Sequence, residues 1–289
     1  MGFIRDILDI PLLTRALEAG ALSGLCCASL SPLVVIRRMA FVGEGMSHAA
    51  FGGIGVALFL LPHADFSDLG VQAITVLFCL ALGAAIGRVS RNADTAHMTE
   101  DSAIGIAFSV SMALGALLIR LHMLHEKGSS FVPSVDYYLF GSLLNVSSRD
   151  VWILAGLACA VLALLAIFQK ELLFYAFDAR LAELSGLNVS VLHYSFLLLL
   201  VLAVVVSSRV VGIILVSASL ILPGVTALKL CERLLPALIV STILGILSFA
   251  IGMYVSYQHD VYPGSAIILI QFALLLAASG WQRLRTASV

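Results

Sequence analysis

Residues 41–55, FVGEGMSHAAFGGIG, place a carboxylate and an imidazole, Glu44 and His48, inside an apolar run long enough to cross a membrane. A bilayer core about 30 Å thick needs about 20 predominantly apolar residues per helix. The whole chain agrees with this interpretation, since 61% of its 289 residues are hydrophobic and 11% are charged, whereas a soluble domain carries about 25% charged residues. The sequence therefore predicts an integral membrane protein built from helices.

Apolar runs of this length recur along the chain, and charged residues cluster between them. We predict nine spans, with eight as the alternative because the seventh is the weakest: residues 17–36, 41–61, 70–87, 103–121, 151–169, 190–207, 211–228, 235–257 and 264–281. The predicted fold class is an all-α, polytopic transmembrane helix bundle in one domain, 1–289. Residues 1–15 lack the basic start and the continuous apolar core of a cleaved signal, and they predict an interfacial amphipathic helix.

The basic residues predict the orientation. If nine spans alternate, ten of the sixteen Lys and Arg residues fall on one side, which the positive-inside rule assigns to the cytoplasm: Arg37, Arg38, Arg88, Arg91, Lys170, Arg180, Lys229, Arg233, Arg283 and Arg285. We therefore expect the N-terminus outside and the C-terminus inside. A net charge of −1 gives no indication of nucleic acid binding.

Glu44 and His48 would lie deep in the membrane. If Arg38 marks the inner interface, a rise of 1.5 Å per residue puts Glu44 about 9 Å and His48 about 15 Å below it. A charge at the midplane costs about 2.5–3.5 kcal/mol, so this face should turn toward protein or a wet cavity. Residues four apart share one stripe of a helix, so one ion could contact both side chains. Gly52 and Gly55 continue the stripe, and we expect them to leave it open.

Two other interpretations of this stretch stay open. Gly45, Ala49 and Gly53 form a small-residue face that favours helix packing, and Glu44 could then simply hydrogen-bond to His48 or to a neighbouring helix. A carboxylate and an imidazole in a membrane also suit a proton relay. Two ligands do not complete a transition-metal site, so the others would come from another helix, from water, or from a second copy of the chain.

Other polar groups form weaker candidates. Four histidines fall on predicted outer loops near acidic residues, where they are either a metal-attracting rim or ordinary solvated side chains: His63, His122, His125 and His259, near Asp65, Glu126 and Asp260. An inner loop holds Asp94, His97, Glu100 and Asp101, of which we expect Asp101 to cap the following helix. Ser47 and His48 are adjacent and project about 100° apart on a helix, which disfavours an intramembrane hydrolase.

Four segments, in this order, resemble the marker segments of the membrane-spanning subunits of bacterial zinc, manganese and iron ABC importers: GEGMSHAAFGGIGVAL, EDSAIGIAFSVSMALGALL, VDYYLFGSLLNVSSRD and VVGIILVSASLILPGVTA. The resemblance covers residues from about 15 to 281. It implies a permease of the bacterial cytoplasmic membrane, related in fold to vitamin B12 and siderophore permeases, that imports Zn²⁺ or Mn²⁺ before Fe²⁺.

The resemblance also implies which proteins work together with this chain. Such a permease works as a dimer, receives metal from an extracytoplasmic solute-binding protein, and is driven by a pair of cytoplasmic ATPase subunits that bind the ATP. The chain itself would then be no enzyme and would hold no cofactor. It agrees with this prediction in having no GxxxxGK[ST] phosphate loop anywhere.

By similarity, Glu44 and His48 are the ion contacts. The coupling helix that docks on the ATPase would be residues 178–188, with Asp178, Ala182 and Gly186; the residues themselves give Asp178 as a helix N-cap and Gly186 as a terminator. The outer gate would be residues 137–147, with Tyr137, Tyr138, Phe140 and Gly141.

Two alternatives remain for the function. The chain could be a permease for a metal chelate such as a siderophore, which has no use for direct protein ligands. It could also be a secondary, proton-coupled metal carrier, although such a carrier should show more acidic or His residues on several helices than this chain has.

Overall fold

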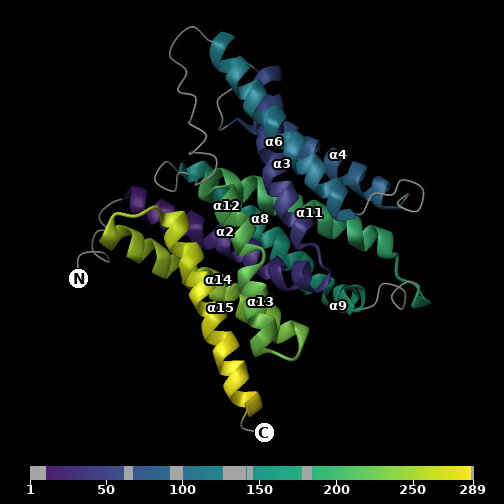
Figure 1. The fold of residues 1–289 in the computed structure, drawn as a ribbon, viewed down its shortest axis with the longest axis vertical. Coiled ribbons are helices and arrows are strands. Elements are labelled where there is room, and N and C mark those ends of the chain that lie inside the picture. The colour runs from purple at the N-terminus through teal and green to yellow at the C-terminus, as the bar shows by residue number, and fades with distance from the viewer. Residues whose placement is uncertain are drawn as a thin grey trace.

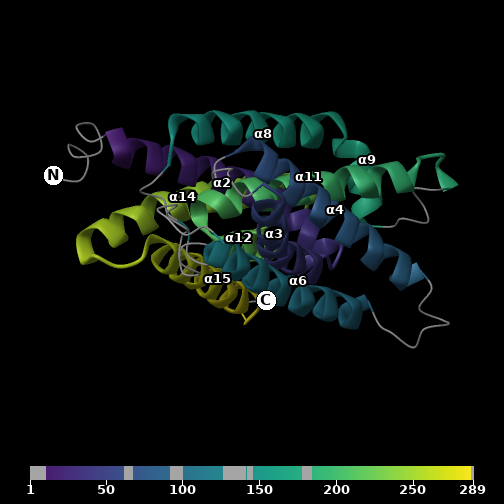
Figure 2. The ribbon, with the colours of Figure 1, turned by 90° about the horizontal axis from the view of Figure 1, so that it is seen from above.

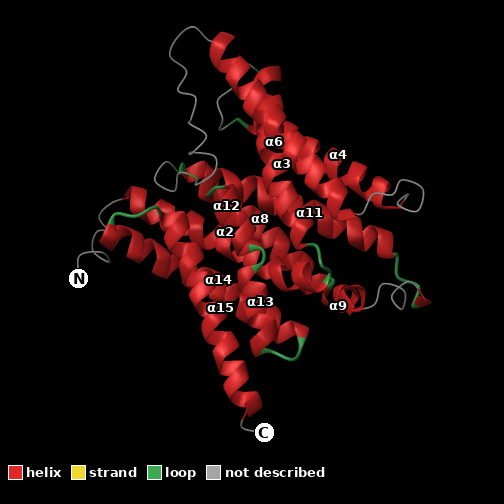
Figure 3. Cartoon of the chain, viewed as in Figure 1, coloured by secondary structure: helices red, strands yellow, loops and turns green. Residues whose placement is uncertain are grey.

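A computed structural model describes residues 11–61, 68–91, 100–125, 141, 146–177 and 184–287, and the regular structure in these ranges is helical (Figures 1 and 3). The helices are α2 (Pro11–Ile36), α3 (Ala40–Leu60), α4 (Leu69–Arg91), α6 (Glu100–His125), α8 (Ser148–Ile167), α9 (Gln169–Phe177), α11 (Val189–Val211), α12 (Ile213–Ser219), α13 (Leu222–Leu230), α14 (Leu234–His259) and α15 (Pro263–Ala287). Within these ranges, seven helical segments are long and apolar enough to cross a membrane. The prediction of an all-α membrane protein is confirmed.

Each of the nine predicted spans falls on helical residues, although α3 and α4, the second and third, are not among the seven segments above. The seventh is broken into α12 and α13 around Leu220 and Ile221. The first begins at Pro11, so residues 11–15 belong to α2, while residues 1–10 of the predicted interfacial helix lie outside the described residues. Four helices continue at least four residues past their predicted ends: α4 to Arg91, α6 to His125, α11 to Val211 and α15 to Ala287.

The helices form two groups around α2 and α3. Helix α2 packs against α8, α11, α13 and α14, whereas α3 packs mainly against α4 and α6. In Figure 1 the group of α3, α4 and α6 lies above, α13, α14 and α15 lie below, and α2, α8, α11 and α12 lie between them. Figure 2 shows α8 along one side of the molecule, with α6 and α15 toward the other. Helices α11 and α12 contact both α2 and α3, and so join the groups.

Helix α2 contains a proline, and α14 compensates for it. Pro32 has no N–H, so the carbonyl of Ala28, four residues earlier, has no partner within α2. The buried hydroxyl of Ser241 in α14 donates to this oxygen at 2.6 Å. Gly24 and Gly245 bring the two helices close, since a Cβ built on Gly245 would lie 3.0 Å from the Gly24 carbonyl oxygen. The α2–α14 contact therefore supplies the polar partner that a proline in a membrane helix requires.

The break between α12 and α13 also depends on α2. Ile221 precedes α13 and has no side-chain cap, and Pro223 at the start of that helix has no N–H to donate. The Gly224 N–H donates to the Ser31 hydroxyl of α2 at 2.9 Å. A side chain at Gly224 would overlap Ser31, since a Cβ there would lie 2.8 Å from the Pro32 nitrogen. Helix α2 thus caps the second half of the broken span.

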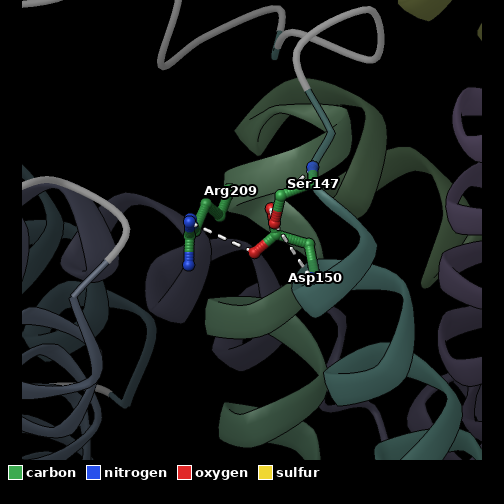
Figure 4. A network of polar contacts seen from close by, with 3 residues as sticks. All are labelled: Ser147, Asp150 and Arg209. Carbon is green, nitrogen blue, oxygen red and sulfur yellow. Dashed lines mark hydrogen bonds and ion pairs between the residues drawn. The ribbon is translucent and has the colours of Figure 1, made fainter. Parts of the chain in front are cut away.

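The first turn of α8 is tied to the last turn of α11 by an ion pair (Figure 4). The Arg209 Nη2 atom lies 3.1 Å from Asp150 Oδ1, and the two side chains are only 12% and 11% exposed. The Ser147 N–H and hydroxyl donate to Asp150 Oδ2 at 3.1 and 2.8 Å, and the Ser147 oxygen accepts from the Asp150 N–H, which completes a capping box. The contact places these two helix ends together, as the predicted topology requires.

We predict that Ser241→Ala destabilises the chain by about 1–3 kcal/mol, because it leaves the buried Ala28 carbonyl without a partner. Thermal unfolding in detergent micelles measures the effect. Ser248→Ala is the matched control, because Ser248 is equally buried in α14 but bonds to Leu244 of its own helix. Equal losses in the two variants would show that Ser241 does not compensate for Pro32.

We also predict that Asp150→Asn and Arg209→Gln are coupled. Each single change leaves a mostly buried charge without its counter-charge. The double variant should therefore lose less unfolding free energy than the two single variants lose together, with a coupling energy of about 0.5–3 kcal/mol. Denaturant unfolding of all four proteins gives this value. The same cycle with Arg149, which is exposed and adjacent to Asp150, should give a coupling near zero, and equal couplings would contradict the prediction.

Candidate functional site

Glu44 and His48 lie near the beginning of α3, directly after a tight turn from α2. Arg38 adopts φ 57°, the left-handed conformation that often ends a helix. The N–H of Arg38 donates to the Val35 carbonyl at 3.1 Å and that of Met39 to Val34 at 2.8 Å, and α3 begins at the next residue. This Schellman turn leaves no flexible loop between α2 and α3.

Glu44 is exposed on the surface of the single chain. Its two neighbours face other helices: a Cβ built on Gly43 would lie 3.4 Å from Leu220 Cδ1, and one on Gly45 would lie 2.9 Å from Ile104 Cγ2. Because successive helical residues project about 100° apart, the Glu44 side chain leaves α3 between these two contacts. The carboxylate therefore points away from the chain that carries it.

His48 is half-buried against α6. Its ring meets the Phe108 ring edge-on, with centroids 4.2 Å apart and planes at 88°. The Nδ1 atom is buried, and no hydrogen-bond partner for it is found among the described residues. Glu44 thus does not bond to this nitrogen, and the imidazole is positioned by packing on Phe108.

Gly52 and Gly55 do not leave the stripe open, contrary to the expectation. A Cβ on Gly52 would lie 2.7 Å from the Ser111 carbonyl oxygen, and one on Gly55 would lie 2.8 Å from the Gly115 Cα. Both contacts are with α6 of the same chain, because small residues on both helices let the two backbones approach closely. A second copy therefore cannot reach α3 at these glycines, and the accessible part of the stripe lies at Glu44.

The small-residue face proposed for packing is real. Gly53 lies against α4, where an added Cβ would be 3.0 Å from Thr75 Cα, and Ala49 is fully buried. Gly45 contacts α6, as described above. Packing thus explains the glycines of this stretch, but it does not explain an exposed carboxylate beside them.

The structure corrects several outer and inner candidates. His122 and His125 are not in a loop but in the last turns of α6, where His122 is buried. His259 ends α14 and is exposed, next to Asp260 in a left-handed conformation. Asp101 is the second residue of α6 and not its cap. Glu100 is the first residue of α6. The other members of these two groups lie outside the described residues: His63, Asp65, Asp94, His97 and Glu126.

Within the described ranges, His, Cys, Asp and Glu side chains nowhere gather in a group of three that could hold a metal ion. Glu44 and His48 are therefore at most a partial ligand set in one chain. The described cysteines are free, and Cys26, Cys27 and Cys79 are buried as small packing residues.

The predicted coupling and gate segments are described only in part. Gly186 adopts φ 83°, as a helix-terminating glycine does, and has open space around it, while Leu184 beside it is 85% exposed. Gly141 adopts φ 73°, and a Cβ there would lie 2.8 Å from the Val210 carbonyl oxygen, so it packs on the end of α11. The remaining candidates lie outside the described residues: Asp178, Ala182, Tyr137, Tyr138 and Phe140.

Sequence reasoning missed a cluster that joins α2, α9 and α11. The Arg37 guanidinium lies 4.0 Å above the Tyr175 ring, and its Nη1 donates to the Tyr175 carbonyl at 3.1 Å. The Tyr175 hydroxyl lies 2.6 Å from His193 Nδ1. Burial raises the pKa of the Tyr175 hydroxyl, against the opposing charge of Arg37, so the proton stays in place and can be donated to a neutral Nδ1. Arg37 and Tyr175 are 138 residues apart, and no spacing signal relates them.

Comparisons with known proteins agree with this architecture. A family model described as "ABC 3 transport family" matches residues 9–282. The chain is 34% identical to the manganese transport system membrane protein MntC of Halalkalibacterium halodurans over 96% of this chain and 89% of that protein. It is 32% identical to a probable iron transport system membrane protein of Haemophilus influenzae over 98% of both.

A solved structure shows the same fold. PsaBC from Streptococcus pneumoniae, in complex with Fab, superposes with a TM-score of 0.83 at 29% identity, covering 96% of this chain and 94% of that one. The resemblance found in the four marker segments is therefore confirmed, and the protein is a multi-pass component of the bacterial cell membrane. This chain belongs to the ABC 3 transport family.

Proposed function

We propose that this chain is the permease subunit of an ATP-driven importer of divalent transition metal ions, with Mn²⁺ as the first candidate. A carboxylate and an imidazole accept Mn²⁺, Fe²⁺ and Zn²⁺, and their affinity order does not select the biological ion. The residues alone allow Mn²⁺ and Zn²⁺ equally. The relatives are named as manganese and iron transport proteins, which favours Mn²⁺.

One observation carries this proposal: Glu44 is exposed on α3, a 21-residue helix that packs among the spanning helices and that we propose also crosses the membrane. A carboxylate facing lipid costs at least about 2.5–3.5 kcal/mol near the bilayer centre. This face of α3 is therefore expected to be covered by protein or by a water-filled pathway. A second copy of the chain, meeting the first at Glu44, would add a second carboxylate and imidazole to the partial ligand set.

Partner proteins carry out ATP hydrolysis and the delivery of the ion. ATP hydrolysis takes place in a separate pair of cytoplasmic subunits, since the chain has no phosphate loop. A solute-binding protein delivers the ion on the outer side. The segment that ends at Gly186 is the docking site for the ATPase, and its exposed Leu184 and the open turn support that role.

We predict that Glu44→Gln and His48→Ala each lower the uptake of radioactive Mn²⁺ at least tenfold, because each removes an ion ligand while the fold is retained. Uptake is measured in cells that express the complete transporter, after assembly with the ATPase has been verified by co-purification. Glu18→Gln is the matched control, since Glu18 is an exposed carboxylate of α2 with no part in the stripe. Parental uptake in both variants would mean that the pair serves only packing.

The same assay identifies the substrate. Unlabelled Mn²⁺ should compete for uptake more strongly than Fe²⁺ or Zn²⁺ at equal concentration. Import of a ferric siderophore without competition by free metal ions would contradict direct coordination by Glu44 and His48. Uptake that persists without the ATPase subunit would instead identify a secondary carrier.

We predict that Gly186→Trp uncouples ATP hydrolysis from transport while membrane insertion stays normal. A bulky side chain at this position would begin in open space. It would project from the surface on which we propose that the ATPase docks. Any L-residue other than Gly is also strained at this positive φ, by roughly 1–2 kcal/mol. Gly186→Asn separates the two effects, because Asn tolerates this conformation best and is small. Severalfold lower uptake per ATP is expected for Trp and near-parental coupling for Asn, and equal coupling in both would refute the docking role.

A further inference from the structure

We propose that the cluster of Arg37, Tyr175 and His193 is the connection that transmits movement of the ATPase-docking segment to the metal-binding helix α3. The inference rests on the proposed function and assigns positioning roles to three residues that touch neither the ion nor ATP. It follows from how the cluster is packed, where Arg37 lies in the chain, and which of its polar atoms lack partners.

Tyr175 anchors the end of α9 to two other helices. It is only 1% exposed, and each of its polar groups is engaged: the carbonyl with Arg37 Nη1 and the hydroxyl with His193 Nδ1. Helix α9 ends two residues later at Phe177, immediately before the predicted docking segment. A displacement of that segment would therefore act first on a residue that is held at its backbone carbonyl and ring face by Arg37 and at its hydroxyl by His193.

Arg37 passes such a displacement to α3. It is the first residue after α2, and the following Schellman turn at Arg38 and Met39 leads directly into α3. Glu44 lies four residues into α3 from Ala40, roughly 6 Å along that helix. Because the intervening backbone is a hydrogen-bonded turn and a helix, a shift of Arg37 moves the beginning of α3 and not a loose loop.

Two polar atoms beside this connection point to a second arrangement. Arg37 Nε and Glu171 Oε2 are buried, and neither finds a hydrogen-bond partner in the described part of the chain. Glu171 precedes Tyr175 by four residues on α9, so the two lie on one face of that helix. The charges are opposite, and a shift of α9 along Arg37 would exchange the bond to the Tyr175 carbonyl for one to Glu171. An unpaired buried polar atom is costly, so an arrangement that pairs Arg37 with Glu171 would compete with the one observed.

The experiment compares three variants in the complete transporter, reconstituted in proteoliposomes with its ATPase and solute-binding protein. Arg37→Gln removes the charge and the stacking on Tyr175. Tyr175→Phe keeps the ring and the carbonyl and removes only the bond to His193. Arg149→Gln is the matched control, because it removes an exposed charge from α8, outside the cluster and outside the turn into α3. Radioactive Mn²⁺ uptake and phosphate release are measured together, and the readout is ions imported per ATP hydrolysed.

Arg37→Gln should lower this ratio at least fivefold and Tyr175→Phe at least twofold, while Arg149→Gln keeps the parental ratio. A purely structural role would lower uptake and hydrolysis together through poor assembly and leave the ratio unchanged, which would overturn the proposal. If Arg37→Gln does not assemble, Tyr175→Phe decides, and a parental ratio there would equally overturn it. A parental complex that imports none of the three metals would instead contradict the proposed function itself.

Discussion

Every polar group inside a lipid bilayer must find its partner within the protein, because the hydrocarbon core offers no water. The fold depends on this constraint wherever a helix is interrupted. Pro32 frees the Ala28 carbonyl, which Ser241 then occupies, and the break before α13 leaves the Gly224 N–H for Ser31. Both compensations involve α2. This helix is therefore central to the bundle not only by its position but because it receives a hydrogen bond from α14 at Ala28 and accepts one from α13 at Ser31.

The same constraint applies to charged side chains. Asp150 and Arg209 neutralise each other at the junction of α8 and α11, and Arg37 is covered by the ring of Tyr175. Glu44 is different, since the single chain leaves it exposed on α3, which the sequence predicts as a span. An unpaired carboxylate in that position is costly, so it belongs where another molecule, an ion or water, meets α3. The contrast between the mostly buried pair of Asp150 and Arg209 and the exposed carboxylate of Glu44 is what distinguishes the candidate site.

The candidate site lies close to the turn that joins α2 to α3, where the two helix groups meet. Helix α3 is fixed to α2 by a Schellman turn at one end and to α6 by close glycine contacts beyond His48. The exposed part of the stripe thus lies near the end of α3 that adjoins Arg37, at the boundary between the two helix groups. A movement that enters through α9 would reach the ion contacts over a short, hydrogen-bonded path.

Much of this protein was predictable from local chemistry. Hydropathy is a property of each segment, so the spans and the all-α class followed from composition, and the i, i+4 geometry of a helix placed Glu44 and His48 on one stripe without knowledge of any neighbour. The marker segments were enough to recognise the family.

Local chemistry could not say which helix lies against which face. The packing of Gly52 and Gly55 on α6, the burial of His122 and the contact of Arg37 with Tyr175 are decided by packing between segments far apart in the sequence. In a chain whose helices are apolar on nearly every side, the hydrophobic pattern does not identify the partner of each face; close backbone approach and the pairing of buried polar groups do.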